Sequence, residues 1–161
     1  MPGPELVFRP VGYHDPDAAK LVAEVQQHYV RRYGGQDDTP VDPAEFAPPL
    51  GLFLVGYLDQ VPVACGGWRA HDTPEPHFLD GDAEVKRMYV VPSVRRRGYA
   101  RLLLAELERT AAERGRRRTV LETGLKQPEA IALYTANGYT AIPKFGLYRC
   151  SETSRCYGKV L

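Results

Sequence analysis

The segment from residue 84 to residue 123 restricts the fold more than any other part of the chain. Residues 84–91 form a predicted strand, which ends at Pro92. Apolar residues then repeat at helical spacing up to Gly115, at Ala100, Leu103, Leu104, Leu107 and Ala111. Residues 119–123 form a second predicted strand. A strand, a helix and a strand in this order predict a βαβ crossover, and therefore a mixed α/β sheet.

Strands and helices are also expected on both sides of this unit. The other strands are predicted at residues 6–11, 51–58, 61–68, 139–142 and 155–161, and the other helices at residues 15–33 and 128–137. The acidic, proline-rich segment 36–49 is expected to be a loop with one short helical turn, and 71–82 an irregular loop. We therefore predict one domain over residues 1–161, with six to seven strands and about four helices.

Charge is distributed unevenly, although the formal net charge is only +1. Residues 1–85 contain 14 acids and 5 bases, whereas residues 86–118 contain 11 bases and 3 acids. A basic face of this kind fits either nucleic acid or a phosphorylated cofactor. A set of solvated helix faces would produce the same asymmetry.

Other features narrow the class of protein. No apolar run approaches the roughly 18 residues of a membrane span, and the N-terminal residues lack the regions of a signal peptide. The three cysteines suggest neither a disulfide framework nor a zinc site, and the four histidines lack metal-ligand spacing. We expect a cytoplasmic protein with reduced thiols, without a metal and without a membrane partner.

Four arginines surround a glycine at the predicted start of the long helix, in the segment 95–101. A helix N-terminus presents unpaired backbone N–H groups and a partial positive charge, which suit it to bind phosphate. Gly98 lets the backbone approach a ligand closely, and Ala100 keeps the next contact small. The segment is neither a Rossmann nor a Walker motif. Its spacing alone leaves open a basic loop in which the glycine only permits a turn.

The arrangement Arg95-x-x-Gly98-x-Ala100 resembles the Gln/Arg-x-x-Gly-x-Gly/Ala signature of the GNAT superfamily of N-acetyltransferases. Residues 83–90 are similar to the fourth strand of that family, and residues 121–139 to its fifth strand and the helix that follows. The closing residues 156–161 are also typical of it. The resemblance is dense over residues 83–161 and only architectural over residues 1–70.

This resemblance implies a sheet that splays between strands 84–91 and 119–123, with acetyl-CoA in the split. The backbone of Met88, Tyr89 and Val90 is expected to pair with the pantetheine arm, and backbone N–H groups of residues 96–101 to hold the pyrophosphate. The expected cofactor-binding residues also include Arg95, Arg96, Arg97, Gly98, Tyr99, Ala100, Arg101, Gln127 and Tyr134. The family often has Asn where this chain has Gln127, and Gln keeps both amide functions.

Acetyl transfer to an amine requires a base, donors for the developing oxyanion and an acid for the leaving thiolate. Glu84 resembles the general base of histone-type members and is the first candidate. Glu122 resembles a base of members that acetylate ribosomal proteins and is the second. Either could instead be a sheet carboxylate paired with a nearby Arg or Lys. Tyr134 resembles the general acid of the family, and its alternative is a core aromatic residue at helical spacing.

The acceptor is expected to be a cationic primary amine, either a small molecule or a lysine or peptide, because acidic loops border the family's acceptor site. Asp37, Asp38, Trp68 and Asp72 are the candidate substrate residues. Two other functions remain open at this point: a non-catalytic acyl-CoA-binding or sensor domain on the same fold, and a nucleic-acid-binding module that uses the arginines. The second lacks a recognised binding motif, so we expect no nucleic-acid partner. The sequence leaves a homodimer open.

Overall fold

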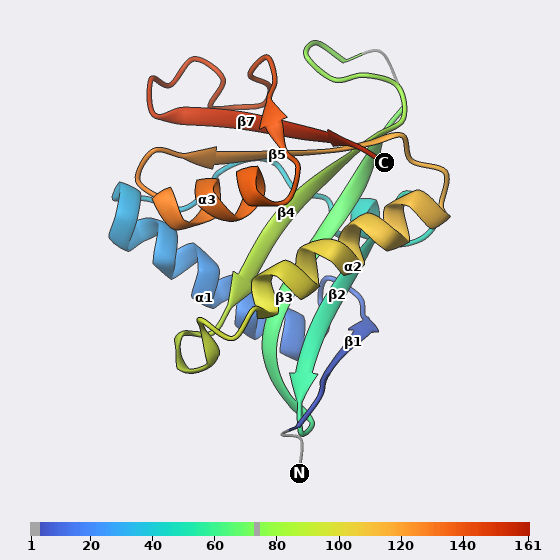
Figure 1. Ribbon diagram of the computed structural model, residues 1–161, viewed down its shortest axis with the longest axis vertical. Helices are drawn as coiled ribbons and strands as arrows, with labels where there is room; N and C mark the ends of the chain where they lie inside the picture. Colours follow the sequence, from blue (N-terminus) through green and yellow to red (C-terminus); the bar gives the residue numbers. More distant parts are fainter. Residues whose placement is uncertain (1–3, 73–74) are drawn as a thin grey trace.

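The computed structural model describes residues 4–72 and 75–161. Within these residues the chain forms one seven-stranded mixed sheet in the order β1-β2-β3-β4-β5-β7-β6 (Figure 1). The strands are β1 (Leu6–Pro10), β2 (Gly51–Leu58), β3 (Val61–His71), β4 (Asp82–Val90), β5 (Arg118–Gly124), β6 (Thr140–Ala141) and β7 (Ser154–Val160). The same residues contain the α-helices α1 (Pro16–Tyr33), α2 (Tyr99–Glu113) and α3 (Pro128–Ala136), and the short 3-10 helices η1 (Pro43–Phe46) and η2 (Pro92–Val94).

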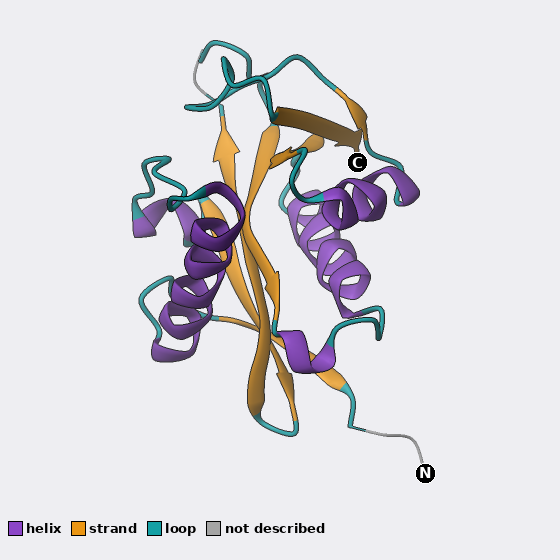
Figure 2. Cartoon of the chain, turned by 90° about the vertical axis from the view of Figure 1, so that its left-hand side faces the viewer, coloured by secondary structure: helices purple, strands orange, loops and turns teal. Residues whose placement is uncertain are grey.

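Helices cover both faces of the sheet, which Figure 2 shows on edge. One apolar cluster joins α1 to β2 and β3 through residues such as Leu21, Val25 and Phe53. A larger cluster on the opposite face contains Leu103, Leu104 and Leu107 of α2 together with Tyr134 of α3. The helical spacing of the α2 residues directs them all to this face, which is why the segment folds back onto the sheet.

The sheet divides into two parts at the pairing of β4 with β5. These parallel strands are paired only where Asp82–Glu84 lie beside Arg118–Val120, and they diverge beyond that point. A β-bulge lies further along β4, where its register with β3 shifts between Cys65 and Gly67. Arg87 lies at this shift and has a φ of 61°, a left-handed conformation that non-glycine residues seldom adopt. The backbone edge of β4 beyond Glu84 therefore lacks a strand on its β5 side.

These observations confirm the expected mixed sheet, its splay between the strands at 84 and 119, and the helical turn within 36–49. Two boundaries differ from the prediction by more than one residue. β3 continues to His71 and β4 begins at Asp82, because these two residues pair with each other at the end of the β3–β4 ladder. The described residues contain three α-helices, and the remaining helical segments are short 3-10 turns. None of the helices in the described ranges is long and apolar enough to cross a membrane.

Candidate active site

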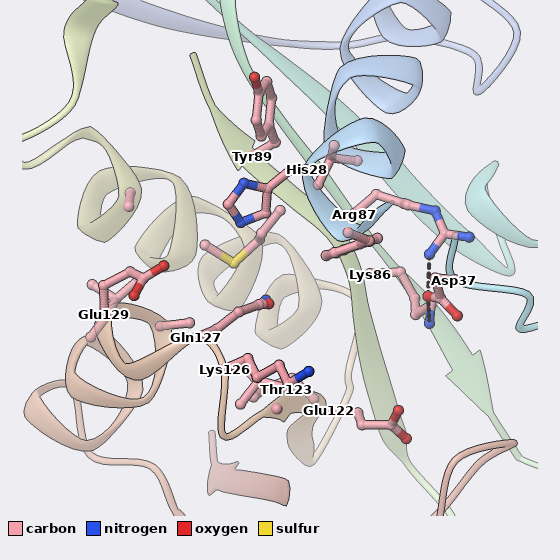
Figure 3. A pocket seen from close by; sticks show the side chains of 18 of the residues that line it. His28, Asp37, Lys86, Arg87, Tyr89, Glu122, Thr123, Lys126, Gln127 and Glu129 are labelled. Atoms are coloured by element: carbon pink, nitrogen blue, oxygen red, sulfur yellow. Dashed lines mark hydrogen bonds and ion pairs between the residues drawn. The ribbon is translucent and has the colours of Figure 1, made fainter. Parts of the chain in front are cut away.

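A cavity of about 830 Å³ occupies the split between β4 and β5 (Figure 3). Its walls come from both halves of the sheet, from the turn before α2, from α3 and from the C-terminal end of α1. From the sheet, the lining includes residues 85–90 of β4 and 121–124 of β5. From the helices and turns it includes residues 94–96 and 98–101 at the turn and the start of α2, residues 126, 127, 129, 130, 133 and 134 around α3, and residues 25, 28, 29, 33 and 35–38 of α1 and the loop after it. Residues 148, 151, 153 and 154, at and just before the start of β7, complete it. The cavity thus brings together segments that are far apart in the sequence.

The turn at residues 95–101 provides backbone donors to one end of the cavity. Among the residues that the structure describes, no backbone acceptor is found for the N–H groups of residues 96–101, whereas the N–H of Leu102 bonds to Gly98. Arg96 and Gly98 have φ values of 65° and 81°, which curl the backbone before α2 begins. A Cβ on Gly98 would meet no atom within 4 Å, so this side of the turn is open. Free N–H groups at a helix start form a suitable site for a phosphate.

The arginines of this turn have different surroundings. The Nε of Arg95 donates a hydrogen bond of 2.9 Å to the carbonyl oxygen of Val90, and its guanidinium lies 5.6 Å from the centre of the Tyr89 ring. Arg95 therefore fastens the turn to the end of β4. Arg96 and Arg101 line the cavity, and the lining does not include Arg97.

Gln127 and Tyr134 enter the cavity from α3 and the residue before it. The Oε1 atom of Gln127 is buried and has no hydrogen-bond partner among the described residues. Tyr134 is buried, and its ring centre is 5.8 Å from that of Tyr139. Burial raises the pKa of Tyr134 to about 12, so its hydroxyl keeps its proton at neutral pH.

Glu122 faces the cavity from β5, on the far side of the split from β4 (Figure 3). Burial raises the pKa of Glu122 to about 7, and the positive charge of nearby Lys86 only partly opposes this. The side chain forms no ion pair with any described residue. A carboxylate with a pKa near neutrality is half ionised at pH 7 and can accept a proton, which are the properties of a general base.

Glu84, the first candidate for the base, occupies a different place. Its Oε1 atom accepts hydrogen bonds of 2.9 Å from both Arg69 Nε and His71 Nε2, and it does not line the cavity. Burial alone would raise the pKa of Glu84, but the bond from His71 and the charge of Arg69 hold it below its ordinary value. This arrangement matches the alternative of a sheet carboxylate with local partners, and it gives Glu84 a structural environment.

Lys86 and Arg87 of β4 lie together on the cavity wall and share one partner, Asp37. The Lys86 Nζ is 2.8 Å from Asp37 Oδ2, and the Arg87 guanidinium bonds to the same oxygen. Burial would raise the pKa of Asp37, but these two bases and the Thr39 N–H hold it well below its usual range. Asp37 therefore stays ionised, and its charge is already compensated within the chain.

Of the other candidate substrate residues, Trp68 and Asp72 do not line the cavity. Trp68 is only 1% exposed and donates a 3.1 Å hydrogen bond from Nε1 to Thr110 of α2, so the expected substrate residue occupies a core position. The alternation of β3 directs its side chain toward α2. Asp72 is outside the cavity lining and pairs with Arg116 at 2.7 Å. Asp38 does line the cavity, and its N–H bonds to the Tyr148 hydroxyl at 2.8 Å.

Lys86 and Arg87 line the cavity but were not predicted as site residues from the sequence. Strict alternation along a strand would direct two successive side chains to opposite faces, and only the bulge at Arg87 brings both to Asp37. The adjacent Lys-Arg pair in the middle of a largely apolar strand is the signal that could have pointed to them.

The cavity fits coenzyme A by its own donors and acceptors. Free N–H groups of the turn suit phosphate, the unpaired edge of β4 suits an extended chain of amides, and the buried Oε1 of Gln127 lacks an amide donor. Met88, Tyr89 and Val90 lie along this edge. Each of these features contains polar groups that have no partner among residues 4–72 and 75–161.

Comparisons with known proteins agree with this geometry. A family model described as the acetyltransferase (GNAT) family matches residues 22–139. An IAA acetyltransferase of Azospirillum brasilense is 33% identical over 129 residues, which is 80% of each chain. The solved structure of a Klebsiella pneumoniae protein assigned as an acyl-CoA N-acyltransferase has a TM-score of 0.78 and 27% identity, and covers 97% of both chains. The PaiA N-acetyltransferase of Thermoplasma acidophilum, solved with coenzyme A, shares the fold at a TM-score of 0.70 and 13% identity, over 98% of this chain and 99% of that one.

Proposed function

The chain belongs to the acetyltransferase (GNAT) family and is an acetyl-CoA-dependent N-acetyltransferase, and we propose that it transfers the acetyl group to a primary amine by direct attack in a ternary complex. The observation that carries this proposal is the cavity in the sheet split. It has free backbone donors at the 95–101 turn and, on β5, a carboxylate with a pKa of about 7.

We assign cofactor binding to both sides of the split. Backbone N–H groups of residues 96–101 hold the pyrophosphate, with added attraction from Arg96 and Arg101. The edge of β4 at residues 88–90 pairs with the amides of the pantetheine arm, and Gln127 accepts one further hydrogen bond. When bound, acetyl-CoA supplies the activated acetyl carbonyl. The N–H groups of residues 88–90 are the proposed donors to the negative charge that develops on its oxygen.

Glu122 is the proposed general base. A free alkyl amine has a pKa of about 10.4, so almost all of it is protonated near pH 7 and lacks the lone pair needed for attack. Glu122 accepts this proton, directly or through water, and the neutral nitrogen then attacks the acetyl carbon. A new C–N bond forms as the C–S bond breaks, and the nitrogen, which carries a positive charge after the attack, releases its second proton to solvent. We place Glu122 ahead of Glu84 because only Glu122 lines the cavity without an ion-pair partner.

Tyr134 is the proposed general acid. Its pKa of about 12 keeps the phenol protonated, so it can give its proton to the departing thiolate. Tyr134 is buried in the cavity wall on α3. No described carboxylate there accepts a hydrogen bond from its hydroxyl, so the proton is available to the thiolate. Tyr134 then recovers a proton from solvent before the next turnover.

The acceptor binds as an ammonium cation and is deprotonated within the site. A polycationic acceptor is not favoured, because Asp37 is compensated by two bases and Asp72 by Arg116. A screen of acetyl-CoA turnover against small amines, amino acids and lysine peptides, with free thiol as the readout, tests the proposal. Acetyl-CoA binding without thiol release for any amine would instead support the non-catalytic, acyl-CoA-binding alternative.

A further inference from the structure

We infer that the amine accepted by this enzyme carries a carboxylate group, and that Lys86 and Arg87 hold this carboxylate near Glu122. The substrate class that fits is a free amino acid, or another amine with a carboxylate a few bonds away. This conclusion rests on the proposed function, since it concerns the second substrate of that reaction. It follows from the balance of charges at one end of the cavity.

The bulge in β4 creates a pair of bases on one face of the sheet. Lys86 and Arg87 are consecutive, yet both reach Oδ2 of Asp37. Met88 and Tyr89 then return to opposite faces, where they join different apolar clusters. The Sγ of Cys65 donates to the carbonyl oxygen of Arg87 at 3.3 Å, which satisfies the backbone at the irregular residue. The two bases are therefore fixed by the fold rather than by a flexible loop.

One carboxylate compensates only one of these two charges. The side chains of Lys86, Arg87 and Asp37 are 10%, 3% and 16% exposed, so water screens them weakly. Asp37 is also fixed in place: Thr39 N–H bonds to its Oδ1 at 3.0 Å, and the Gln26 side chain bonds to its backbone N–H at 2.8 Å. One positive charge remains in excess on the cavity wall.

Two neighbouring carboxylates, Glu84 and Glu122, do not supply the missing anion. The positive charge of Lys86 reaches Glu84, but the Oε1 atom of Glu84 is already bonded to Arg69 and His71. Glu122 lies across the split (Figure 3), forms no ion pair with Lys86 and has its pKa raised to about 7 by burial. The Nε of Arg87 is buried and has no acceptor among the described residues. A buried base with unused donors is costly unless an anion completes it. Charge-assisted bonds to a carboxylate are the usual solution for such a pair.

An amino acid satisfies both sides of this site. Its ammonium can donate to Glu122, while its carboxylate meets Lys86 and Arg87. A polyamine or a lysine side chain would bring further positive charge toward two bases and offer them no anion. The hydroxyls of Thr123 and Ser154, which line the same cavity and are buried without partners in the described structure, provide additional polar contacts.

Matched substrates test this inference without changing the protein. Acetyl-CoA turnover is measured for phenylalanine, phenylalaninamide and phenethylamine, and for the equivalent sets from leucine and alanine, in which the amide and the decarboxylated amine carry no carboxylate, with free thiol as the readout. We expect kcat/KM for the best free acid to exceed that of its amide by about tenfold or more, because the amide leaves the excess charge unpaired. Equal or better turnover of the amide or the decarboxylated amine overturns the inference and leaves the proposed function intact. Absence of turnover with every amine rejects both.

Variants of the enzyme test the role of the bases. Lys86→Gln should reduce the ratio of acid to amide turnover toward one, and Lys86→Arg should restore most of it. Lys20→Gln, on an exposed position of α1 outside the cavity, should leave this ratio unchanged. Thermal unfolding establishes that each variant is folded. A folded Lys86→Gln enzyme that keeps the wild-type ratio contradicts the assignment.

Discussion

Replacing Glu122 by Gln should make the protein more stable and the enzyme much slower. The pKa of about 7 means that the fold disfavours the ionised form of Glu122 relative to the unfolded chain, where the ordinary value of 4.5 applies. Between these two values the folded state binds more protons than the unfolded state. The free energy of unfolding of the wild type therefore decreases as pH rises from 4.5 to 7. The full difference corresponds to about 3 kcal/mol.

Glu122 is partly exposed, so solvent screening reduces this penalty to about 1–3 kcal/mol. Gln cannot ionise and does not incur it. Urea unfolding at pH 8 should consequently give Glu122→Gln a larger free energy of unfolding than the wild type, and the difference should vanish near pH 4. The acid limb of the kcat/KM profile, with an apparent pKa near 7, should disappear, and turnover at pH 7.5 should fall by about 100-fold or more.

Glu84→Gln is the matched control, because the sign of its effect on stability is opposite. Glu84 has a lowered pKa and bonds to Arg69 and His71, so removing its charge takes away the buried partner that these two side chains share and leaves them only the more exposed Glu45 and Glu75. A loss of about 3–5 kcal/mol is expected. A Glu122→Gln enzyme that is less stable than the wild type at pH 8, or that keeps the limb near pH 7, would refute the assignment of Glu122 as a desolvated general base.

Three further changes are expected to have distinct effects, and two of them have a contrasting control. Gly98→Ala should weaken acetyl-CoA binding by about tenfold in calorimetry, because the added methyl group lies in the turn that we propose holds the pyrophosphate. Gly115→Ala, with a similar φ of 80° and open space, should cost about 1 kcal/mol of stability without affecting binding. Tyr134→Phe should lower kcat by about 100-fold with little change in Tm. Tyr139→Phe loses the hydrogen bonds to Thr119 and Glu108, so it should lower Tm and leave kcat unchanged. Asp37→Asn should destabilise the fold at pH 7 by about 3–5 kcal/mol in urea unfolding, and the loss should shrink as pH falls below 3.8, where the unfolded chain binds a proton at Asp37.

The cofactor half of the cavity could be predicted from the sequence because it depends on local signals. A strand, a glycine in a basic turn and an amphipathic helix are contiguous in the chain, and their geometry follows from residues 84–115 alone. The position of Gln127 and Tyr134 followed from the same resemblance. In each case the backbone conformation is set within a few residues of the side chain in question.

The acceptor half could not be predicted, because it depends on partners that only the tertiary structure brings together. Glu84 and Glu122 are both strand carboxylates in the sequence, and nothing local shows that Arg69 and His71 reach one of them and leave the other free. The same holds for Asp37, whose compensation by bases 49 and 50 residues away reverses the argument from regional charge. Regional net charge describes neither pairing nor burial, and these two properties decide the electrostatics of a site.

The bulge at Arg87 connects the two halves of the site. A left-handed φ at a non-glycine residue costs on the order of 1–3 kcal/mol, which the Cys65 thiol and the ion pair with Asp37 help to offset. The bulge lies beyond the last pairing of β4 with β5, on the backbone edge that we propose binds the cofactor, and it brings two adjacent bases to one oxygen of Asp37. A regular strand at this point would send Arg87 to the face opposite Lys86. The proposed cofactor edge and the proposed acceptor charges therefore adjoin one irregular backbone conformation.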